Sequence, residues 1–267
     1  MTPVARQDEP EARLRTLDLD EHLRDPHRKQ RFVTTMFEVI AERYDRFTLL
    51  FSYGMDRYWK RELLEELRAV AAAPPVVLDL ACGTGDLALG TRTQFPSARV
   101  IGFDVARRML SRAKHRARAT HTGARFAAAD MTCLPVRDRT AHAVLAGYAI
   151  RNAPNPTFAL REIARVLRQG GLLLTLDFYR PRNALWRRLF VGYLRLAGNV
   201  TGWLWHRQPV AYGYIAASIE HHVSWQDLSD LLATHGFRVR RVSRKLLGGI
   251  AIHVASLDEA TVAATAD

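Results

Sequence analysis

The sequence predicts an α/β protein whose doubly wound, mostly parallel sheet ends in an antiparallel hairpin. Short apolar runs of strand length alternate with segments of helical periodicity, an order typical of parallel sheets with helices on both faces. The first apolar run, 76–81, leads into a glycine loop and then into a helical segment, 86–95. The last two runs are separated by Gly248-Gly249, a turn that pairs neighbouring strands antiparallel.

Two helices are expected before the sheet. An apolar stripe at helical spacing, which includes Phe32, Met36 and Ile40, predicts a helix over 31–43. A turn around 52–54 leads to a second helix over 57–70, which Pro74-Pro75 ends. The later elements are expected as strand 76–81, helix 86–95, strand 99–103, helix 106–119, strand 125–129, strand 141–147, helix 156–168, strand 171–178, helix 225–234, strand 237–244 and strand 250–256.

A chain of 267 residues is long enough for one well-packed α/β domain, which we expect over residues 32–256. Residues 1–31 alternate acids and arginines without an apolar core, so we expect a mobile charged tail there, and residues 257–267 form a second tail. The two cysteines, Cys82 and Cys133, show no disulfide pattern. These features predict a cytoplasmic protein.

A basic and aromatic segment over 180–222 accounts for part of the net charge of +12. Between Asp177 and Glu220 there is no acidic residue. The segment from residue 180 onward holds six arginines and seven aromatic residues: Arg180, Arg182, Arg187, Arg188, Arg195, Arg207, Trp186, Phe190, Tyr193, Trp203, Trp205, Tyr212 and Tyr214. Such a pattern suits stacking on bases or contact with lipid headgroups. We expect a cap over an apolar substrate, with peripheral membrane contact through 180–214; an ordinary packed lid with solvated arginines is the alternative. The run 189–205 is too short and too interrupted to span a bilayer.

Acidic residues at the ends of three predicted strands indicate a site for a nucleotide-type cofactor. Asp104 follows the second strand, where a carboxylate accepts hydrogen bonds from both ribose hydroxyls of an adenosine. Helix capping by these acids is the simpler alternative. The loop 83–88 also fits the loose dinucleotide pattern G-x-G-x-x-A, but Asp79 and Asp130 favour S-adenosyl-L-methionine over NAD. The predicted cofactor-binding residues are Asp79, Gly83, Thr84, Gly85, Asp104, Asp130, Met131 and Gly147.

Three separated stretches resemble the ubiquinone/menaquinone biosynthesis C-methyltransferases. They are residues 36–60, with the motif Ser52-x-Gly54-x-x-Arg57-x-Trp59-Lys60; residues 78–86; and Ile150-Arg151-Asn152 with residues 165–171. Fainter matches follow at 212–219 and 247–253. The resemblance implies a class I, Rossmann-like methyltransferase fold. It also implies S-adenosyl-L-methionine-dependent C-methylation of a prenylated quinol, either demethylmenaquinol or its ubiquinone-pathway counterpart.

The acceptor side of the site is expected just after the fourth strand. Arg151 is predicted to stabilise a phenolate or to position a water molecule, and Asn152 to hold a quinol oxygen. For Arg151 a buried salt bridge to a cofactor-site acid is the alternative. Tyr148, Tyr179 and His253 are further candidates for lining the acceptor pocket, with packing as the alternative for each. The pair His221-His222 has no ligand pattern around it, so we expect no metal.

Departures from the family pattern keep other functions open. Asp56 stands where a histidine is usual, Gly147 where a serine is usual, and Tyr179 where a serine is favoured. One alternative is a methyltransferase acting on another phenolic or polyketide-like ring or on RNA, although a nucleic-acid partner is not expected. The other is a non-catalytic protein that keeps the fold and binds cofactor or membrane. A lipophilic quinol and a second copy of the chain are the expected partners.

Overall fold

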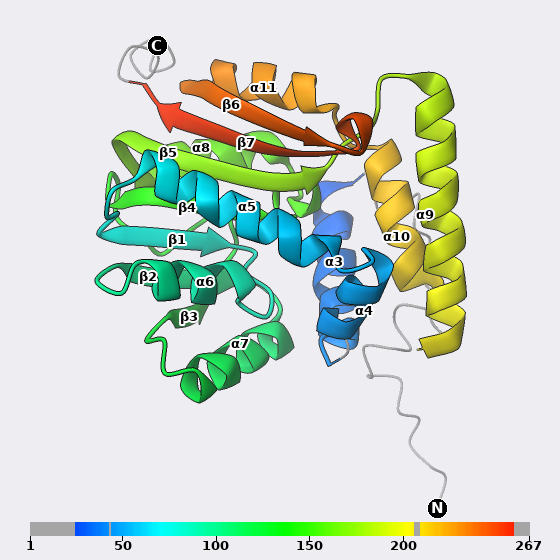
Figure 1. Cartoon of the computed structure of the whole chain (residues 1–267), viewed down its shortest axis with the longest axis horizontal. Helices are drawn as coiled ribbons and strands as arrows, with labels where there is room; N and C mark the ends of the chain where they lie inside the picture. The colour runs from blue at the N-terminus through cyan, green and yellow to red at the C-terminus, as the bar shows by residue number, and fades with distance from the viewer. Residues whose placement is uncertain (1–24, 43, 206–208, 259–267) are drawn as a thin grey trace, which may run out of the picture.

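A seven-stranded sheet of order β3-β2-β1-β4-β5-β7-β6 forms the centre of the computed structural model, which describes residues 25–42, 44–205 and 209–258 (Figure 1). The strands are β1 (Val76–Leu80), β2 (Arg99–Asp104), β3 (Arg125–Ala128), β4 (Ala141–Gly147), β5 (Leu167–Phe178), β6 (Phe237–Lys245) and β7 (Ile250–Leu257). The first five are parallel, and β7 runs antiparallel to both β5 and β6. The predicted doubly wound sheet with a terminal hairpin is therefore confirmed.

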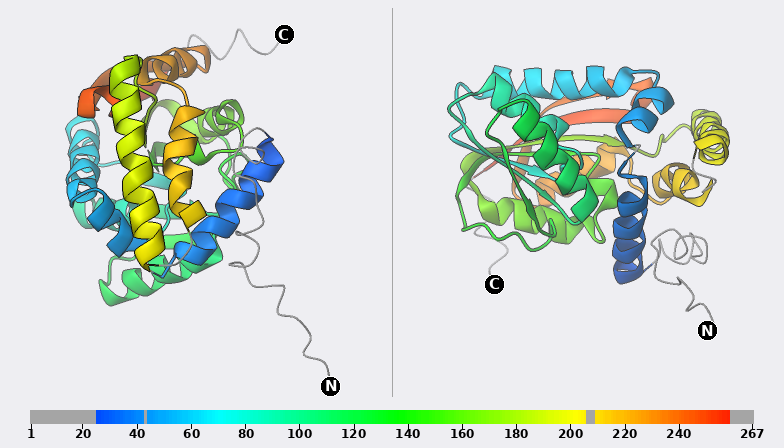
Figure 2. Two further views of the ribbon diagram at one scale, coloured as in Figure 1. Left: turned by 90° about the vertical axis from the view of Figure 1, so that its right-hand side faces the viewer. Right: turned by 90° about the horizontal axis from the view of Figure 1, so that it is seen from below.

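Helices cover both faces of the sheet because successive strand residues point to opposite faces. Val77 belongs to the core under α5 (Met55–Val70), α6 (Asp86–Gln94) and α7 (Arg107–Ala119). The next residue, Leu78, belongs to the opposite core, under α8 (Pro156–Val166) and α11 (Trp225–Thr234). The view from below shows the two helical layers on either side of the strands (Figure 2). Parallel strands buried on both faces explain the near-continuous apolar runs in the sequence.

Four further helices lie beyond the carboxyl ends of the parallel strands (Figure 1). They are α3 (Pro26–Ile40), α4 (Tyr44–Phe51), α9 (Ala184–Trp205) and α10 (Pro209–Glu220). The expected cap over 180–222 consists of α9 and α10, which pack through a small apolar core that contains Phe190, Leu194 and Ile219. Of its predicted residues, Arg207 lies outside the described part of the chain, as do the side chains of Trp203, Trp205 and Tyr212. Within the described ranges, no helix is long and apolar enough to cross a bilayer.

The first described helix, α3, begins at Pro26 rather than at the expected Arg31. The Asp25 side chain accepts a hydrogen bond from the Arg28 N–H (2.8 Å), and Pro26 occupies the first helical position, so these two residues start the helix. Residues 26–31, assigned to the tail from their charge pattern, are helical here, and the rest of that tail, residues 1–24, is not described. The shorter helix α4 was also not predicted.

Gly85 ends the glycine loop and precedes α6 with a φ of +87°, and a Cβ there would lie 2.9 Å from the Phe126 ring. Because both the backbone and the neighbour oppose a side chain, we expect Gly85→Ala to lower the free energy of unfolding by about 1–3 kcal/mol. Urea denaturation measures this change. Gly192→Ala on α9, where a Cβ meets no atom within 4 Å, is the control and is expected to be neutral or stabilising. Equal effects of the two changes would contradict the steric explanation.

Candidate active site at the strand ends

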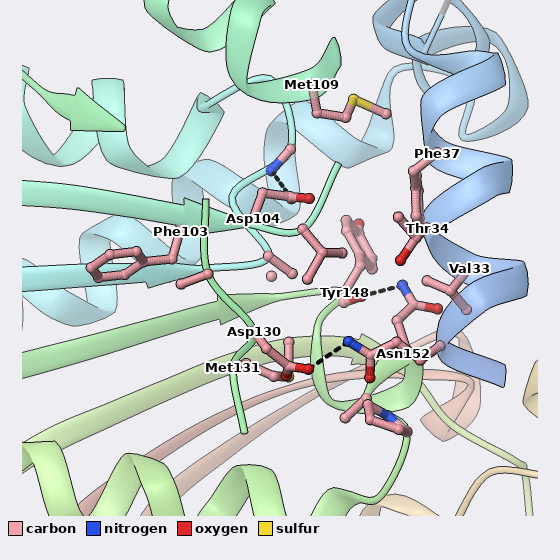
Figure 3. A pocket seen from close by; sticks show the side chains of 18 of the residues that line it. Val33, Thr34, Phe37, Phe103, Asp104, Met109, Asp130, Met131, Tyr148 and Asn152 are labelled. Carbon is pink, nitrogen blue, oxygen red and sulfur yellow. Dashed lines mark hydrogen bonds between the residues drawn. The ribbon is translucent and has the colours of Figure 1, made fainter. Parts of the chain in front are cut away.

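A cavity of about 710 Å³, its open mouth included, lies between α3 and the carboxyl ends of the strands (Figure 3). Its size is in the range of small-molecule sites, about 300–1,000 Å³. Of the predicted cofactor residues, five line it: Gly83, Asp104, Asp130, Met131 and Gly147. The position agrees with the rule that open α/β sheets bind ligands outside the carboxyl ends of their strands.

Asp104 is the last residue of β2 and is 8% exposed. One oxygen accepts a hydrogen bond from the Gly83 N–H and the other from the Ala106 N–H, both at 2.8 Å. Burial raises the pKa of this carboxyl, and the two backbone donors counteract that rise. A carboxylate has about four acceptor positions. Asp104 therefore retains acceptor capacity toward the cavity, as a pair of ribose hydroxyls requires.

Asp130 follows β3 and ties the end of that strand to α3 across the cavity. Its Oδ1 accepts hydrogen bonds from the Thr132 N–H and hydroxyl, both at 2.8 Å, and its Oδ2 accepts one from the Gln30 amide at 2.5 Å. The close-up shows this bond and the side chains of Val33, Thr34 and Phe37, which point from α3 toward the strand ends (Figure 3). The contribution of α3 to this cavity was not predicted from the sequence. The helix start at Asp25-Pro26 was the sequence signal that could have indicated it.

The two glycines that line the cavity lack a side chain for different reasons. A Cβ on Gly83, which has a φ of +54°, would meet no atom within 4 Å, so this position stays open to a ligand. A Cβ on Gly147 would lie 2.6 Å from Leu87 Cδ1, so the glycine there makes room for α6. Gly83 fits the expected close approach of a cofactor, whereas packing already explains Gly147.

Asp79, Thr84 and Gly85 do not line the cavity, in contrast to the prediction of direct cofactor contact. Asp79 is 1% exposed, and its Oδ2 accepts a hydrogen bond from the Ala88 N–H at the start of α6 (2.9 Å). The Thr84 hydroxyl donates to Asp45 Oδ1 at 2.7 Å. Asp79 lies beneath the loop because β1 ends one residue after it, before the chain reaches the cavity. The Asp79 contact holds the loop on α6, and the Thr84 contact holds it on α4.

Burial, with the nearby Asp104 and Asp86 carboxylates, raises the pKa of Asp79 to about 8, against the opposing bond from Ala88. A carboxyl whose pKa is higher in the folded state stabilises the fold at low pH, and this contribution is lost as the pH rises toward 8. We therefore expect Asp79→Asn, which cannot ionise, to gain stability relative to the parent chain as the pH rises from about 4 to about 8, with a constant difference above that. Urea denaturation across this range measures the difference. A difference that does not change with pH would contradict the assignment.

A second cavity of about 600 Å³ adjoins the first and is mostly apolar. The two cavities share Phe37, Tyr44, Tyr148 and Asn152. The remaining lining residues of the second cavity are Met36, Ile40, Thr48, Ser52, Asp56, Trp59, Arg151, Phe178, Tyr214 and Ile215. An apolar space with a few polar groups, placed beside the cofactor cavity, suits a hydrophobic acceptor.

Arg151 lies in the short helix η1 (Ile150–Asn152), directly after β4, and is 5% exposed. Its Nε lies 3.2 Å from Asp177 Oδ1, its backbone N–H donates to Asp177 Oδ2 at 3.0 Å, and its Nη1 donates to the Ser218 hydroxyl. The guanidinium also lies over the rings of Phe178 and Tyr214, 5.8 Å from each centroid. The buried salt bridge considered as the alternative role therefore exists, but its partner is an acid of β5 rather than a cofactor-site acid.

Asn152 lines both cavities and holds their shared wall in place. Its amide nitrogen donates to the Tyr148 carbonyl at 2.7 Å, and its amide oxygen accepts from the Tyr214 hydroxyl at 2.9 Å. Lys29 of α3 donates to the carbonyls of Arg151 (2.9 Å) and Ala153 (2.7 Å). Burial and the nearby Arg151 charge lower the pKa of Lys29 to about 8. Helix α3 is thus fixed to η1 as well as to β3.

The three further residues predicted to line the acceptor pocket divide into two groups. Tyr148 lines both cavities and stacks on Phe178 with a centroid distance of 5.5 Å. Tyr179 and His253 are fully buried and line neither cavity. The Tyr179 ring stacks on His222, and burial lowers the pKa of His253 to about 4. Packing is therefore the role of Tyr179, whose ring lies against His222 and His253, and of His253, whose ring contacts Trp225 and Ser229 of α11.

A network of charged side chains joins α5, α6 and α7 next to the glycine loop. Lys60 Nζ donates to Asp56 Oδ2 at 2.7 Å and to Asp86 Oδ2 at 2.8 Å, and Arg116 lies 2.7 Å from Asp86 Oδ1. Although burial favours the protonated acid, Lys60 and Arg116 hold the pKa of Asp86 at about 2. This network was not predicted, since its members are separated by up to 60 residues in the chain, from Asp56 to Arg116.

Solved structures of similar fold include methyltransferases. One is a putative sarcosine dimethylglycine methyltransferase from Galdieria sulphuraria, with a TM-score of 0.59 at 11% identity over 75% of this chain and 85% of that one. Another is an S-adenosylmethionine-dependent methyltransferase from Aquifex aeolicus, with a TM-score of 0.52 at 16% identity over 72% and 87%. At these identities the likeness concerns the fold.

Sequence comparisons are more specific. The chain is 36% identical to the demethylmenaquinone methyltransferase of Thermus thermophilus, over 82% of this chain and 98% of that one. It is 34% identical to the ubiquinone/menaquinone biosynthesis C-methyltransferase UbiE of Syntrophotalea carbinolica, over 80% and 89%. The model of the ubiE/COQ5 methyltransferase family matches residues 25–256. Together with a cavity whose Asp104, Asp130 and Gly83 fit an adenosyl ligand, these matches show that the chain belongs to the ubiE/COQ5 methyltransferase family and is an S-adenosyl-L-methionine-dependent methyltransferase.

Proposed function

We propose that this enzyme methylates a ring carbon of a prenylated quinol, either demethylmenaquinol or its ubiquinone-pathway counterpart. The observation that carries the proposal is the apolar second cavity, which shares a wall with the cofactor cavity. Its aromatic and aliphatic lining matches a planar ring with a hydrocarbon tail. The names of the relatives from Thermus thermophilus and Syntrophotalea carbinolica support the same class of acceptor.

S-adenosyl-L-methionine supplies an electrophilic methyl group, so the chain has to position an electron-rich ring carbon and favour its phenolate. Asp104 is suited to fix the adenosyl end of the cofactor. The Arg151 guanidinium at the wall of the second cavity is suited to stabilise a quinolate oxygen, with Asp177 and Ser218 fixing its position. Asn152 holds the wall through one N–H and one acceptor position of its amide, and its second N–H is left for the predicted hydrogen bond to a quinol oxygen.

The test is methyl transfer by the purified protein with labelled S-adenosyl-L-methionine. The acceptors are reduced demethylmenaquinone, a reduced demethylbenzoquinone with a short prenyl chain, an unprenylated catechol and a structured RNA. Label in a quinol product supports the proposal, and label only in catechol or RNA refutes it. Mass spectrometry of the quinones of a deletion strain gives an independent answer, because a demethyl species that accumulates identifies the acceptor.

RNA methylation was considered from the basic aromatic segment, in which the described side chains of Trp186, Phe190 and Tyr214 are used in packing. Phe190 and Tyr214 are buried, and the Trp186 ring stacks on Phe190 with a centroid distance of 5.8 Å. These rings are used in packing and are not free to stack on bases. The departure at Tyr179 lies outside both cavities and therefore gives no reason to favour a non-catalytic protein.

We propose further that the enzyme meets its lipophilic acceptor at a membrane surface through an apolar ridge on the outer side of α9. We define the ridge by large side chains that are 43% to 82% exposed: Tyr53, Leu185, Leu189, Tyr193, Leu196, Leu246 and Leu247. Helix α9 faces the viewer in the left view (Figure 2), the Trp186 indole donates to the Leu246 carbonyl at 3.0 Å, and Tyr53 lies beside Tyr193. The exposed Arg188 on the same helix suits anionic lipid.

We expect Leu189→Glu combined with Leu247→Glu to lower binding to vesicles with anionic lipid at least tenfold, because both changes place charge where apolar side chains enter the headgroup region. Co-sedimentation with vesicles measures the binding. Phe158→Glu on α8, which is 54% exposed and distant from the ridge, is the matched control and is expected to leave binding unchanged. If the parent chain binds no vesicles but forms a dimer that the double change converts to a monomer, the ridge is instead a contact with a second copy of the chain.

A further inference from the structure

Asp56 occupies the first turn of α5, is 4% exposed and lines the second cavity. Its Oδ2 accepts a hydrogen bond from Lys60 at 2.7 Å. Its Oδ1 is buried without a hydrogen-bond partner. A buried carboxylate oxygen without a partner is costly, by about 1–3 kcal/mol or more. This cost is removed when a ligand in the cavity donates a hydrogen bond.

The remaining polar groups of the second cavity are poor proton acceptors for an acceptor hydroxyl. Arg151 is permanently protonated. Burial and the nearby Asp56 carboxylate raise the pKa of Tyr148 well above 10, so that side chain remains a phenol. The other polar lining residues are Tyr44, Thr48, Ser52, Asn152 and Tyr214. Among the described residues that line this cavity, Asp56 is the one carboxylate, and neither histidine nor lysine is present.

The charged groups around Asp56 do not occupy its second oxygen. Lys60 is shared between Asp56 and Asp86, and Asp86 is also paired with Arg116, so the two acids face two cations. The titratable and charged groups that face Asp56 from neighbouring elements are Lys60 on α5, Asp86 on α6, Arg116 on α7, Tyr44 on α4, and Tyr148 and Arg151 after β4.

We propose that Asp56 is the general base that accepts the hydroxyl proton of the acceptor during methyl transfer, an inference that rests on the proposed quinol acceptor. As the ring carbon bonds to the methyl group, the sulfur–methyl bond breaks and positive charge develops on the ring hydroxyl. The O–H bond then breaks and its proton passes to Asp56 Oδ1. The ring regains aromaticity when the methylated carbon loses its hydrogen to water as a proton and the oxygen takes the proton back from Asp56. One proton is released for each methyl group transferred.

A carboxylate is suited to this task although it is a weak base toward a free phenol. The hydroxyl becomes strongly acidic only as the carbon–methyl bond forms, so the base is needed in the transition state. Removal of a general base typically costs about 10²- to 10⁴-fold in rate. We therefore expect Asp56→Asn, which keeps the shape and a partner for Lys60, to lower kcat at least 100-fold. The dissociation constant for S-adenosyl-L-methionine should change less than twofold.

Glu66→Gln is the matched control for this experiment. Glu66 is also a buried carboxylate of α5, 7% exposed, and it pairs with Arg241 at 3.3 Å, away from both cavities. This change is expected to leave kcat and the quinol KM within twofold of the parent values. It reports how much activity is lost when α5 loses any buried charge.

Asp56→His distinguishes between two roles of Asp56, that of a base and that of the structural partner of Lys60. A neutral imidazole accepts a proton but does not neutralise an ammonium group, so histidine is expected to recover at least tenfold of the activity that asparagine loses. The pH profile of kcat gives a second readout. The parent and the histidine variant should each lose activity on the acidic side, the variant at higher pH, whereas the asparagine variant should show no such acidic limb.

Two outcomes overturn the inference. The first is that the asparagine variant keeps the kcat and the pH profile of the parent. The second is that histidine fails to recover the lost activity, whereas Asp56→Glu, which also pairs with Lys60, recovers it without shifting the pH profile. If asparagine prevents folding, the comparison of the histidine and glutamate variants decides the question alone. A parent chain that methylates no quinol refutes the proposed function instead, so the two failures are distinguishable.

Discussion

Replacing Arg151 with methionine is expected to lower the free energy of unfolding by about 3–5 kcal/mol and to abolish methyl transfer. The loss of stability follows because Asp177, which is fully buried, then keeps its charge without its guanidinium partner. The backbone N–H groups of residues 151 and 178 still donate to it, but they carry no net charge. Urea denaturation measures the first effect and a methyl-transfer assay the second.

Two further variants make the Arg151 prediction discriminating. Arg182→Met breaks the exposed pair with Asp227 and is expected to cost less than about 1 kcal/mol. Combining Arg151→Met with Asp177→Asn removes both buried charges but keeps an acceptor oxygen for the backbone N–H groups, and should recover most of the stability but none of the activity. A double variant that also regains activity would show that Arg151 serves only as the partner of Asp177.

Asp104→Ala is expected to weaken the binding of S-adenosyl-L-methionine at least 100-fold. Two hydrogen bonds from ribose hydroxyls to a carboxylate contribute about 1.5–3 kcal/mol each, and each 1.4 kcal/mol is about tenfold in affinity. The change also leaves the N–H groups of Gly83 and Ala106 without their acceptor, which loosens the glycine loop. Titration calorimetry measures the dissociation constant.

Asp138→Ala is the control for the calorimetric prediction, because Asp138 is an exposed acid paired with Arg165 outside the cavity. Its dissociation constant for S-adenosyl-L-methionine should equal that of the parent. If Asp104→Ala also binds within threefold of the parent, the end of β2 does not hold the adenosine, and the assignment of the first cavity has to be revised.

The pairing of strands could be predicted because each strand and turn is encoded locally. The alternation of apolar runs with helical stripes gave the parallel sheet, and the turn before Ile250 gave the antiparallel pairing of β6 and β7. The acids at the ends of β2 and β3 were correctly placed at the cavity, because the carboxyl ends of parallel strands meet at one edge. Asp79 was not correctly placed at the cavity, since it lies one residue before the end of β1 and turns toward α6.

The sequence by itself determined the sheet, the glycine loop and the position of the cofactor cavity, since these depend on residues near one another in the chain. Tertiary structure alone decided that α3 closes this cavity through Gln30 and Asp130, which are 100 positions apart, and that Arg151 pairs with Asp177. It also decided that Asp56 lines the acceptor space with one carboxylate oxygen buried and without a hydrogen-bond partner. Packing between distant segments decides which polar groups are buried and therefore need a hydrogen-bonding or charged partner. Local sequence patterns do not encode this packing.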